Sequence, residues 1–440
     1  MTHTLAYVLG VLVLVLGVAV SVALHELGHM IPAKRFGVKV PEYFIGFGPR
    51  IWSTRRGETE YGVKAIWLGG YVKLLGMLPP APPDRPDKPG SMIDEARRES
   101  LAELAEEDRD RAFYRLSVPR KLIVMAGGIL TNLVLGVVCL VLAVGVVGQP
   151  AHTSTLGSVT SCLPTDASGQ DAPVEDCAAD EQTPAVRAGL RAGDTIVSWD
   201  GSTTSTWAEV QEAIAASGTR AVEVVIERDG ARRTLSVTPV EVSRPVTDDN
   251  GAPVTGADGE QLTQMRPYVG IGPALGTVRV PPSQLPAVVG QAVTGTLKAI
   301  ATLPVGLVHS VAAGLGIEER SSEGLVSLVG IGRMAGETTA AGAGSGTVPL
   351  SVRVSAMLSL LGALNLALFA FNLVPLPPLD GGHVAGACWE GLRRLLARMR
   401  GRPDPGHVDT ARLLPVGQAV FVLLVIMAAV LIWVDIVAPL

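Results

Sequence analysis

An uncharged apolar run from Leu5 to Leu24 ends directly in the sequence His25-Glu26-Leu27-Gly28-His29. About 20 such residues are what an α-helix needs to cross a bilayer. Two histidines four residues apart lie on one face of a helix, where both can bind one metal ion. Ionisable side chains at membrane depth are costly, so this placement indicates function more than packing. The feature predicts a membrane-spanning helix with a metal site at one end.

Composition agrees with a membrane protein that also has sizeable soluble parts. The mean hydropathy is +0.37, and the net charge of -5 carries no signature of nucleic-acid binding. Four segments are apolar enough to span, which predicts a polytopic α-helical fold. The expected spans are Leu5 to about Pro32, Leu122–Val147, Val354–Val374 and Leu413–Ile436. We expect the first to be retained, because no A-x-A cleavage site closes it.

The distribution of basic residues predicts the orientation in the membrane. Basic segments follow the first span and separate the third from the fourth, and such segments face the cytoplasm. The N-terminus and the stretch from about Gln149 to Arg353 would then be extracytoplasmic, and the metal site would lie toward the cytoplasmic side of a bacterial plasma membrane. The basic residues are Lys34, Arg35, Lys39, Arg120 and Lys121, then Arg393, Arg394, Arg398, Arg400, Arg402 and Arg412.

The number of spans predicts a third metal ligand. With four spans, the segment 372–383 at the end of the third returns to the cytoplasmic side, and Asp380 reaches the depth of His25 and His29. A catalytic zinc takes three protein ligands and leaves one position open, and a carboxylate suits the third. A fifth span at Leu285–Gly316 would break this geometry. We expect surface-lying amphipathic helices there, because Lys298 and two prolines interrupt the segment.

Four motifs together resemble those of one family. They are HELGH at 25–29, GFGP at 46–49, LGGYVKLLG at 68–76 and NLVPLPPLDGGH at 372–383. HExxH in one span with N-x-x-P-x-P-x-x-D-G-G in a later span is a specific combination. The chain resembles the bacterial site-2 proteases, intramembrane zinc metalloproteases, of the actinobacterial type with one PDZ domain. The resemblance implies cleavage of the transmembrane helix of a single-span partner, often an anti-sigma factor already trimmed by another protease.

The residues themselves agree with such a peptidase. His25, His29 and Asp380 would hold Zn²⁺ with one position open for water. Zinc lowers the pKa of that water to about 7. Glu26 would take the proton and deliver it to the leaving amine.

Other polar residues near the motifs receive lesser roles. The resemblance implies that Asn372 contacts the substrate backbone or the oxyanion, and capping of the helix before Pro375 is compatible with that role. Asn132 is expected to make a hydrogen bond behind the ligands or between helices. His383 and His407 are expected to be ordinary polar residues.

The soluble parts divide into several regions. Residues 33–119 contain short alternating strands, and the resemblance places there a membrane-associated β-sheet on the cytoplasmic side that either pairs with an extended substrate or supports the site. Residues 79–89 are expected to be a linker, and 94–111 a solvated helix or flexible segment. The expected divisions are 1–32, 33–119, 120–148 (second span), 149–245 (PDZ-like), 246–350 (loop and amphipathic region), 351–383 (third span with the LDG motif), 384–411 (basic segment) and 412–440.

Residues from about Leu156 to Val240 resemble a PDZ domain, which predicts an extracytoplasmic α+β unit. The match includes 183–197, a helix near Trp207–Ala215 and strands Val222–Arg228 and Arg233–Pro239. Such a unit would bind a peptide, exclude large ectodomains or act only as a scaffold. Cys162 and Cys177 flank an insertion on the oxidising side of the membrane, which predicts a disulfide that contributes about 3 kcal/mol.

Three other functions compete with an intramembrane peptidase. A membrane-tethered peptidase acting on soluble substrates would carry HExxH away from a span. A PDZ scaffold without catalysis would have no need of Glu26. A metal transporter would need more intramembrane carboxylates than these spans contain. In every case membrane lipid surrounds the spans.

Overall fold

The computed structural model describes residues 2–82, 85–163, 177–178, 181–246, 254, 262–321, 324–342 and 348–439. The chain forms two compact units. The first contains Met1–Val146, Val280–Gly344 and Arg353–Leu440, and the second contains Val147–Arg279 with Ser345–Val352.

Among the described residues, four helices of the first unit are long and apolar enough to cross a membrane, as the sequence predicts. They are α1 (His3–Arg35), α3 (Val118–Leu140, continued by a π-helical stretch at Val141–Gly148), α9 (Leu350–Asn372) and α11 (Leu414–Val437). The segment at 285–316 forms α6 (Leu285–Ala301) and α7 (Leu303–Gly314), which are bent by 75° and would count as a fifth span only if taken together.

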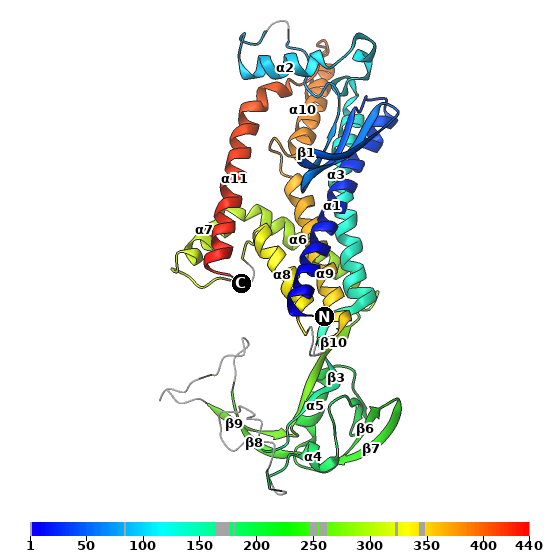
Figure 1. Cartoon of the computed structure of the whole chain (residues 1–440), viewed down its shortest axis with the longest axis vertical. Helices are drawn as coiled ribbons and strands as arrows, with labels where there is room; N and C mark the ends of the chain where they lie inside the picture. The colour runs from blue at the N-terminus through cyan, green and yellow to red at the C-terminus, as the bar shows by residue number, and fades with distance from the viewer. Residues whose placement is uncertain are drawn as a thin grey trace. The chain divides into compact units, whose positions relative to one another are not determined.

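Small residues let the helices of this bundle approach closely. A Cβ on Gly127 of α3 would lie 1.9 Å from the Gly28 carbonyl oxygen of α1. A Cβ on Gly10 would lie 2.4 Å from the Thr339 hydroxyl of α8 (Leu328–Ala340). Close backbone contact at small residues is how helices associate in a bilayer. The packing places α1, α3 and α9 side by side (Figure 1).

A bent β-hairpin packs beside α1. Its strands are β1 (Glu42–Arg56) and β2 (Thr59–Lys73), and both are so bent that residues 42–45 pair with 60–63 on one side and with 70–73 on the other. Tyr43 is buried against α1 and donates a hydrogen bond to the Ala23 carbonyl at 2.7 Å. The hairpin therefore places residues 70–73 next to the HExxH turn of α1.

The charged segment after the hairpin is largely helical and exposed, one of the two forms expected, but two of its charged side chains are buried. It forms α2 (Met92–Ala102) and two 3-10 turns, η1 (Glu106–Arg111) and η2 (Phe113–Arg115). Arg97 is buried and pairs with Asp87 at 2.6 Å and with Asp409 at 2.8 Å. Asp108 is buried against Lys39. Tertiary partners thus hold this segment in place.

Helix α10 (Asp380–Met399) follows the proline-rich turn after α9 and packs antiparallel to α3. Near its middle, Glu390 is buried and pairs with Lys121 of α3 at 2.8 Å. One residue further, a Cβ on Gly391 would lie 3.1 Å from Val118, the first residue of α3. A 3-10 turn, η4 (Thr410–Leu413), leads into α11.

The second unit is an α+β fold with one main sheet. The strand order is β10-β3-β4-β6-β7, with β5 paired to β4, and a separate two-stranded sheet joins β8 to β9. Trp199 and Ile226 lie in its buried core. The elements are β3 (Gln149–Val159), α4 (Pro184–Ala188), β4 (Thr195–Trp199), β5 (Ser202–Thr203), α5 (Trp207–Ser217), β6 (Val222–Arg228), β7 (Ala231–Val237), β8 (Val240–Pro245), β9 (Thr263–Tyr268) and β10 (Ile271–Val278).

One disulfide and one buried ion pair support this unit. Cys162 and Cys177 form a disulfide with a Cα–Cα distance of 5.9 Å, and residues 164–176 between them lie outside the described part of the chain. Asp194 is buried beside Arg228, with Nε–Oδ1 at 2.6 Å. Burial alone would raise the pKa of Asp194, but the guanidinium and the Arg191 N–H lower it below the usual value.

Candidate metal centre

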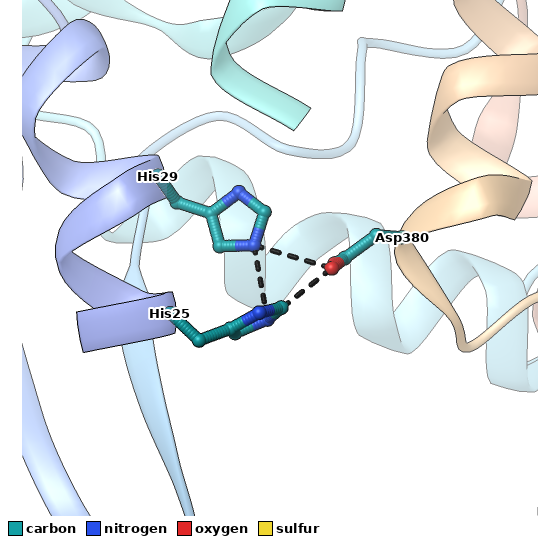
Figure 2. A group of neighbouring side chains, drawn as sticks. All are labelled: His25, His29 and Asp380. Atoms are coloured by element: carbon teal, nitrogen blue, oxygen red, sulfur yellow. Dashed lines mark hydrogen bonds and ion pairs between the residues drawn. The ribbon is translucent and has the colours of Figure 1, made fainter. Parts of the chain in front are cut away.

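Three side chains from two distant parts of the chain converge at one point (Figure 2). His29 Nε2 lies 3.3 Å from His25 Nε2 and 3.2 Å from Asp380 Oδ2, and His25 Nε2 lies 3.3 Å from the same oxygen. Consecutive turns of α1 supply the histidines. Asp380 is the first residue of α10, placed by the turn that follows α9.

These separations fit a tetrahedral zinc ion. Zinc binds His nitrogen and carboxylate oxygen at about 2.0–2.2 Å, so tetrahedral geometry separates neighbouring ligand atoms by about 3.3 Å. All three observed separations match that value. Two nitrogens and one oxygen are also the donor set of a catalytic site that leaves its fourth position open. The chemistry and the spacing of these residues therefore fit a bound zinc.

Each imidazole has an outer partner that orients it. His29 Nδ1 donates to the Val124 carbonyl oxygen at 2.8 Å, so its Nε2 lone pair is free for a metal. The Asn132 amide lies 3.1 Å from His25 Nδ1. A metal-bound His25 keeps its proton on Nδ1, and the Asn132 oxygen accepts that proton once the amide is turned by 180°. Such partners fix the tautomer and ring orientation of metal-binding histidines.

Close helix packing positions the His29 ring. A Cβ on Gly128 of α3 would lie 2.2 Å from His29 Nε2. Only a glycine leaves room for the ring at this point. Gly128 therefore leaves the space that the His29 ring occupies, and Gly127 allows the close contact with the Gly28 backbone.

Glu26 lies beside the cluster and packs against strand β2. A Cβ on Gly70 would lie 3.4 Å from Glu26 Cγ. The hairpin therefore packs against the Glu26 side chain.

A cavity of about 180 Å³ opens over these residues. It adjoins an apolar cavity of about 510 Å³ against α11, which shares Pro378 and His383 with it. The smaller cavity is lined by His25, Glu26, His29, Gly70, Tyr71, Val72, Leu74, Met77, Met125, Pro378, Asp380 and His383. The two cavities therefore share part of their wall on the side of α11.

Three other residues singled out in the sequence lie at different places around the cluster. Asn372 is half-buried at the end of α9 and is not in the lining of either cavity. His383, expected to be an ordinary polar residue, lies in the walls of both. Its position three residues after Asp380 on one helix is the signal that could have found it. His407 lies 3.5 Å from Glu390, outside the cavity lining, as an ordinary polar residue would.

Comparison with known proteins decides the family. The model of Peptidase family M50 matches residues 13–403. The chain belongs to peptidase family M50. The zinc metalloprotease Rip1 of Mycobacterium tuberculosis is 35% identical over 446 aligned residues, which cover 98% of each chain. Rip1 of Mycolicibacterium smegmatis is 34% identical over 96% of this chain and 94% of its own. A putative zinc metalloprotease of Rhizobium meliloti is 26% identical over 94% and 93%.

These matches confirm the resemblance to site-2 proteases that the motifs indicate. With four apolar helices, they also confirm a membrane zinc metalloprotease with Zn²⁺ as its cofactor. The alignment with Rip1 runs over nearly the whole chain, so it includes the residues of the cluster as well as both compact units.

Proposed function

We propose that this M50 peptidase cleaves the transmembrane segment of a single-span membrane protein, with anti-sigma factors as the substrate class. The observation that carries the proposal is the position of the metal cluster. His25 and His29 follow the apolar stretch of α1, and an apolar cavity against α11 adjoins the cavity that they line. A site for soluble peptides has no need of such surroundings.

The residues of the cluster would divide the chemistry among them. His25, His29 and Asp380 would hold zinc. Bound zinc lowers the pKa of its water to about 7 and polarises the scissile carbonyl. Glu26 accepts the proton of the attacking water and delivers it to the leaving amine nitrogen. Glu26 lies in the lining of the cavity over the cluster, where it can reach a water at the open position.

A helix must unwind before its peptide bond can be attacked, and the hairpin offers a partner for the extended form. Residues 70–73 pair with 42–45 on one side only within the described residues, so their other edge is available. Backbone pairing at such an edge binds an extended peptide without regard to its side chains. Asn372 lies outside the cavity lining, and we assign it a contact with the substrate backbone further along, at the turn before Asp380.

The second unit would act on the substrate before cleavage. Its α+β sheet and helix agree with the PDZ-like unit expected at 149–245, either to bind a peptide or to exclude bulky ectodomains. The positive-inside rule puts this unit outside the cell and the cluster toward the cytoplasm. Cleavage would then release the cytoplasmic part of the partner.

Two variants, Glu26→Gln and Asp380→Ala, test these assignments. Each purified protein is co-reconstituted in liposomes with a single-span substrate, and bound zinc and cleavage are both measured. We expect Glu26→Gln to retain zinc and to lose at least about 10²-fold in rate, the usual contribution of a general base. Asp380→Ala should lose zinc and cleavage together.

Three outcomes would contradict the proposal. Cleavage by Glu26→Gln at the wild-type rate would show that Glu26 is not the general base. A wild-type protein without zinc would favour the PDZ scaffold. Equal cleavage of the same sequence as a soluble peptide would favour a membrane-tethered peptidase for soluble substrates.

A further inference from the structure

Helix α10 exposes a continuous apolar face that no described residue covers. Trp389 is 53% exposed and Met399 is 74% exposed. At 100° per residue the exposed side chains occupy about a third of the helix circumference. The opposite face carries the buried Glu390. We define the α10 face by its exposed residues Cys388, Trp389, Leu392, Leu395, Leu396 and Met399.

Most of this face, residues 392–399, lies beyond the start of α3. Glu390 is level with Lys121, and Gly391 is level with Val118, where α3 begins. Since the two helices run antiparallel, residues 392–399 continue about 12 Å past the start of α3. Lipid chains that surround α3 therefore do not cover this part of α10.

Arginines border the α10 face on both sides. By helical spacing Arg393 and Arg400 lie along one edge and Arg398 along the other. Arg398 and Arg400 make no ion pair within the described residues, and Arg393 donates to the Pro405 carbonyl at 3.2 Å. An apolar stripe between two basic edges is complementary to an apolar stripe between two acidic ones.

The same edges argue against two other ways of covering the face. Two copies of the chain joined at this face would bring arginines against arginines, which is repulsive. A bilayer surface would meet only one end of the face, because α10 runs along the axis of α3. A separate helix laid along α10 meets neither difficulty.

We propose that the α10 face is a docking site for an acidic amphipathic helix of another protein. The apolar side chains of the partner helix would pack between Trp389 and Met399 at helical spacing, and the carboxylates of that helix would pair with Arg393, Arg398 and Arg400. The site lies on the same side of the membrane as the start of α3. It does not depend on the proposed function, because it shares no residue with the metal cluster.

The test uses the full chain in nanodiscs of phosphatidylcholine. The probe is a fluorescent 18-residue helical peptide with leucines on one face and glutamates along both edges. A second peptide has lysines in place of the glutamates. We expect the acidic peptide to bind at micromolar concentration and the lysine peptide at least tenfold more weakly. Equal binding of both peptides, or no binding of the acidic one, overturns the proposal.

Variants of the face locate the contact. Leu392→Ser with Leu396→Ser, and separately Arg398→Glu with Arg400→Glu, should each weaken binding of the acidic peptide at least tenfold. The control Arg187→Glu changes an exposed arginine of the second unit and should leave binding unchanged. Bound zinc in every variant shows that the bundle is folded. Unchanged binding by both face variants overturns the proposal.

Cys388, at the border of the face, can report whether a second copy of the chain or the lipid bilayer covers the face instead. These experiments use a Cys139→Ala variant, which removes the other free cysteine. Crosslinking of Cys388 between copies, lost in Leu392→Ser, would show that the face joins two chains. A dye on Cys388 that shifts its emission when phosphatidylglycerol enters the nanodisc would show a lipid contact. Either result overturns the proposal. Absence of both, with peptide binding, supports it.

Discussion

Replacement of Asn132 by leucine tests how the metal cluster is held together. Asn132 is 1% exposed, and its amide lies 3.1 Å from His25 Nδ1. Leucine has the same branched shape and the same number of side-chain heavy atoms, so it tests the loss of the hydrogen bond with little change in the shape of the side chain. With zinc bound, the Nδ1 proton of His25 is left buried without an acceptor, which costs about 1–3 kcal/mol.

The loss should appear in zinc affinity more than in folding. Without metal, His25 can move its proton to Nε2, where Asp380 Oδ2 lies 3.3 Å away, so the metal-free state escapes most of the penalty. Zinc affinity should therefore fall by 10–100-fold, as for outer partners of metal-binding histidines generally, or about 1.4–2.7 kcal/mol. Zinc-saturated Asn132→Leu should keep a rate near that of the wild type.

Asn365→Leu is the matched control. Asn365 is 2% exposed and also lies in an apolar helix, but its Nδ2 donates to Ser21 Oγ at 3.0 Å and it does not touch the cluster. Competition with a chromophoric chelator measures zinc affinity in both variants and the wild type. Affinity of Asn132→Leu within twofold of the wild type would refute the reasoning. An equal loss in Asn365→Leu would assign the effect to helix packing in general.

Three further predictions concern other contacts. Gly128→Ala should abolish zinc binding, measured by metal analysis, because the new methyl group displaces the His29 ring; full zinc occupancy would contradict this. Asp194→Asn should lower the stability of the second unit by about 3 kcal/mol, measured by hydrogen exchange of β4 and β6 in the full chain. Because the folded pKa of Asp194 lies below its unfolded value, the stabilisation by Arg228 is present at neutral pH and lost as pH falls through the folded pKa; pH-independent exchange protection in acid would contradict it. Chelation of zinc should lower the melting temperature of the wild type reversibly, since a ligand at 100 times its Kd stabilises by about 2.7 kcal/mol, and it should leave that of Asp380→Ala unchanged.

Much of this protein could be predicted from local sequence patterns. Hydropathy over about 20 residues marks the four apolar helices, because a bilayer selects for composition over a fixed length. The spacing of His25 and His29 sets them on one helix face. Strand β6 has the bounds that the resemblance to a PDZ domain predicts. In each case the deciding physics acts within a few residues of the chain.

Long-range packing decided what these patterns leave open. Asp380 is 351 residues from His29, and only the close crossing of α1 and α3 and the turn after α9 set their 3.2 Å separation. Parity of the spans predicts the side of the membrane but not this distance. Asn372, expected at the substrate, lies outside the cavity lining, because the proline-rich turn separates it from Asp380.

Buried polar residues show the same division most clearly. Arg97 lies in a segment whose charges predict exposure, yet Asp409 and Asp87 compensate for its burial. His383 looks ordinary in sequence and lines the cavity in the structure. The sequence by itself determined which segments are apolar and which residues can bind a metal, since both are properties of residues near one another. Only the tertiary structure decided which polar groups meet, because the partner that makes burial of a charge affordable comes from a distant part of the chain.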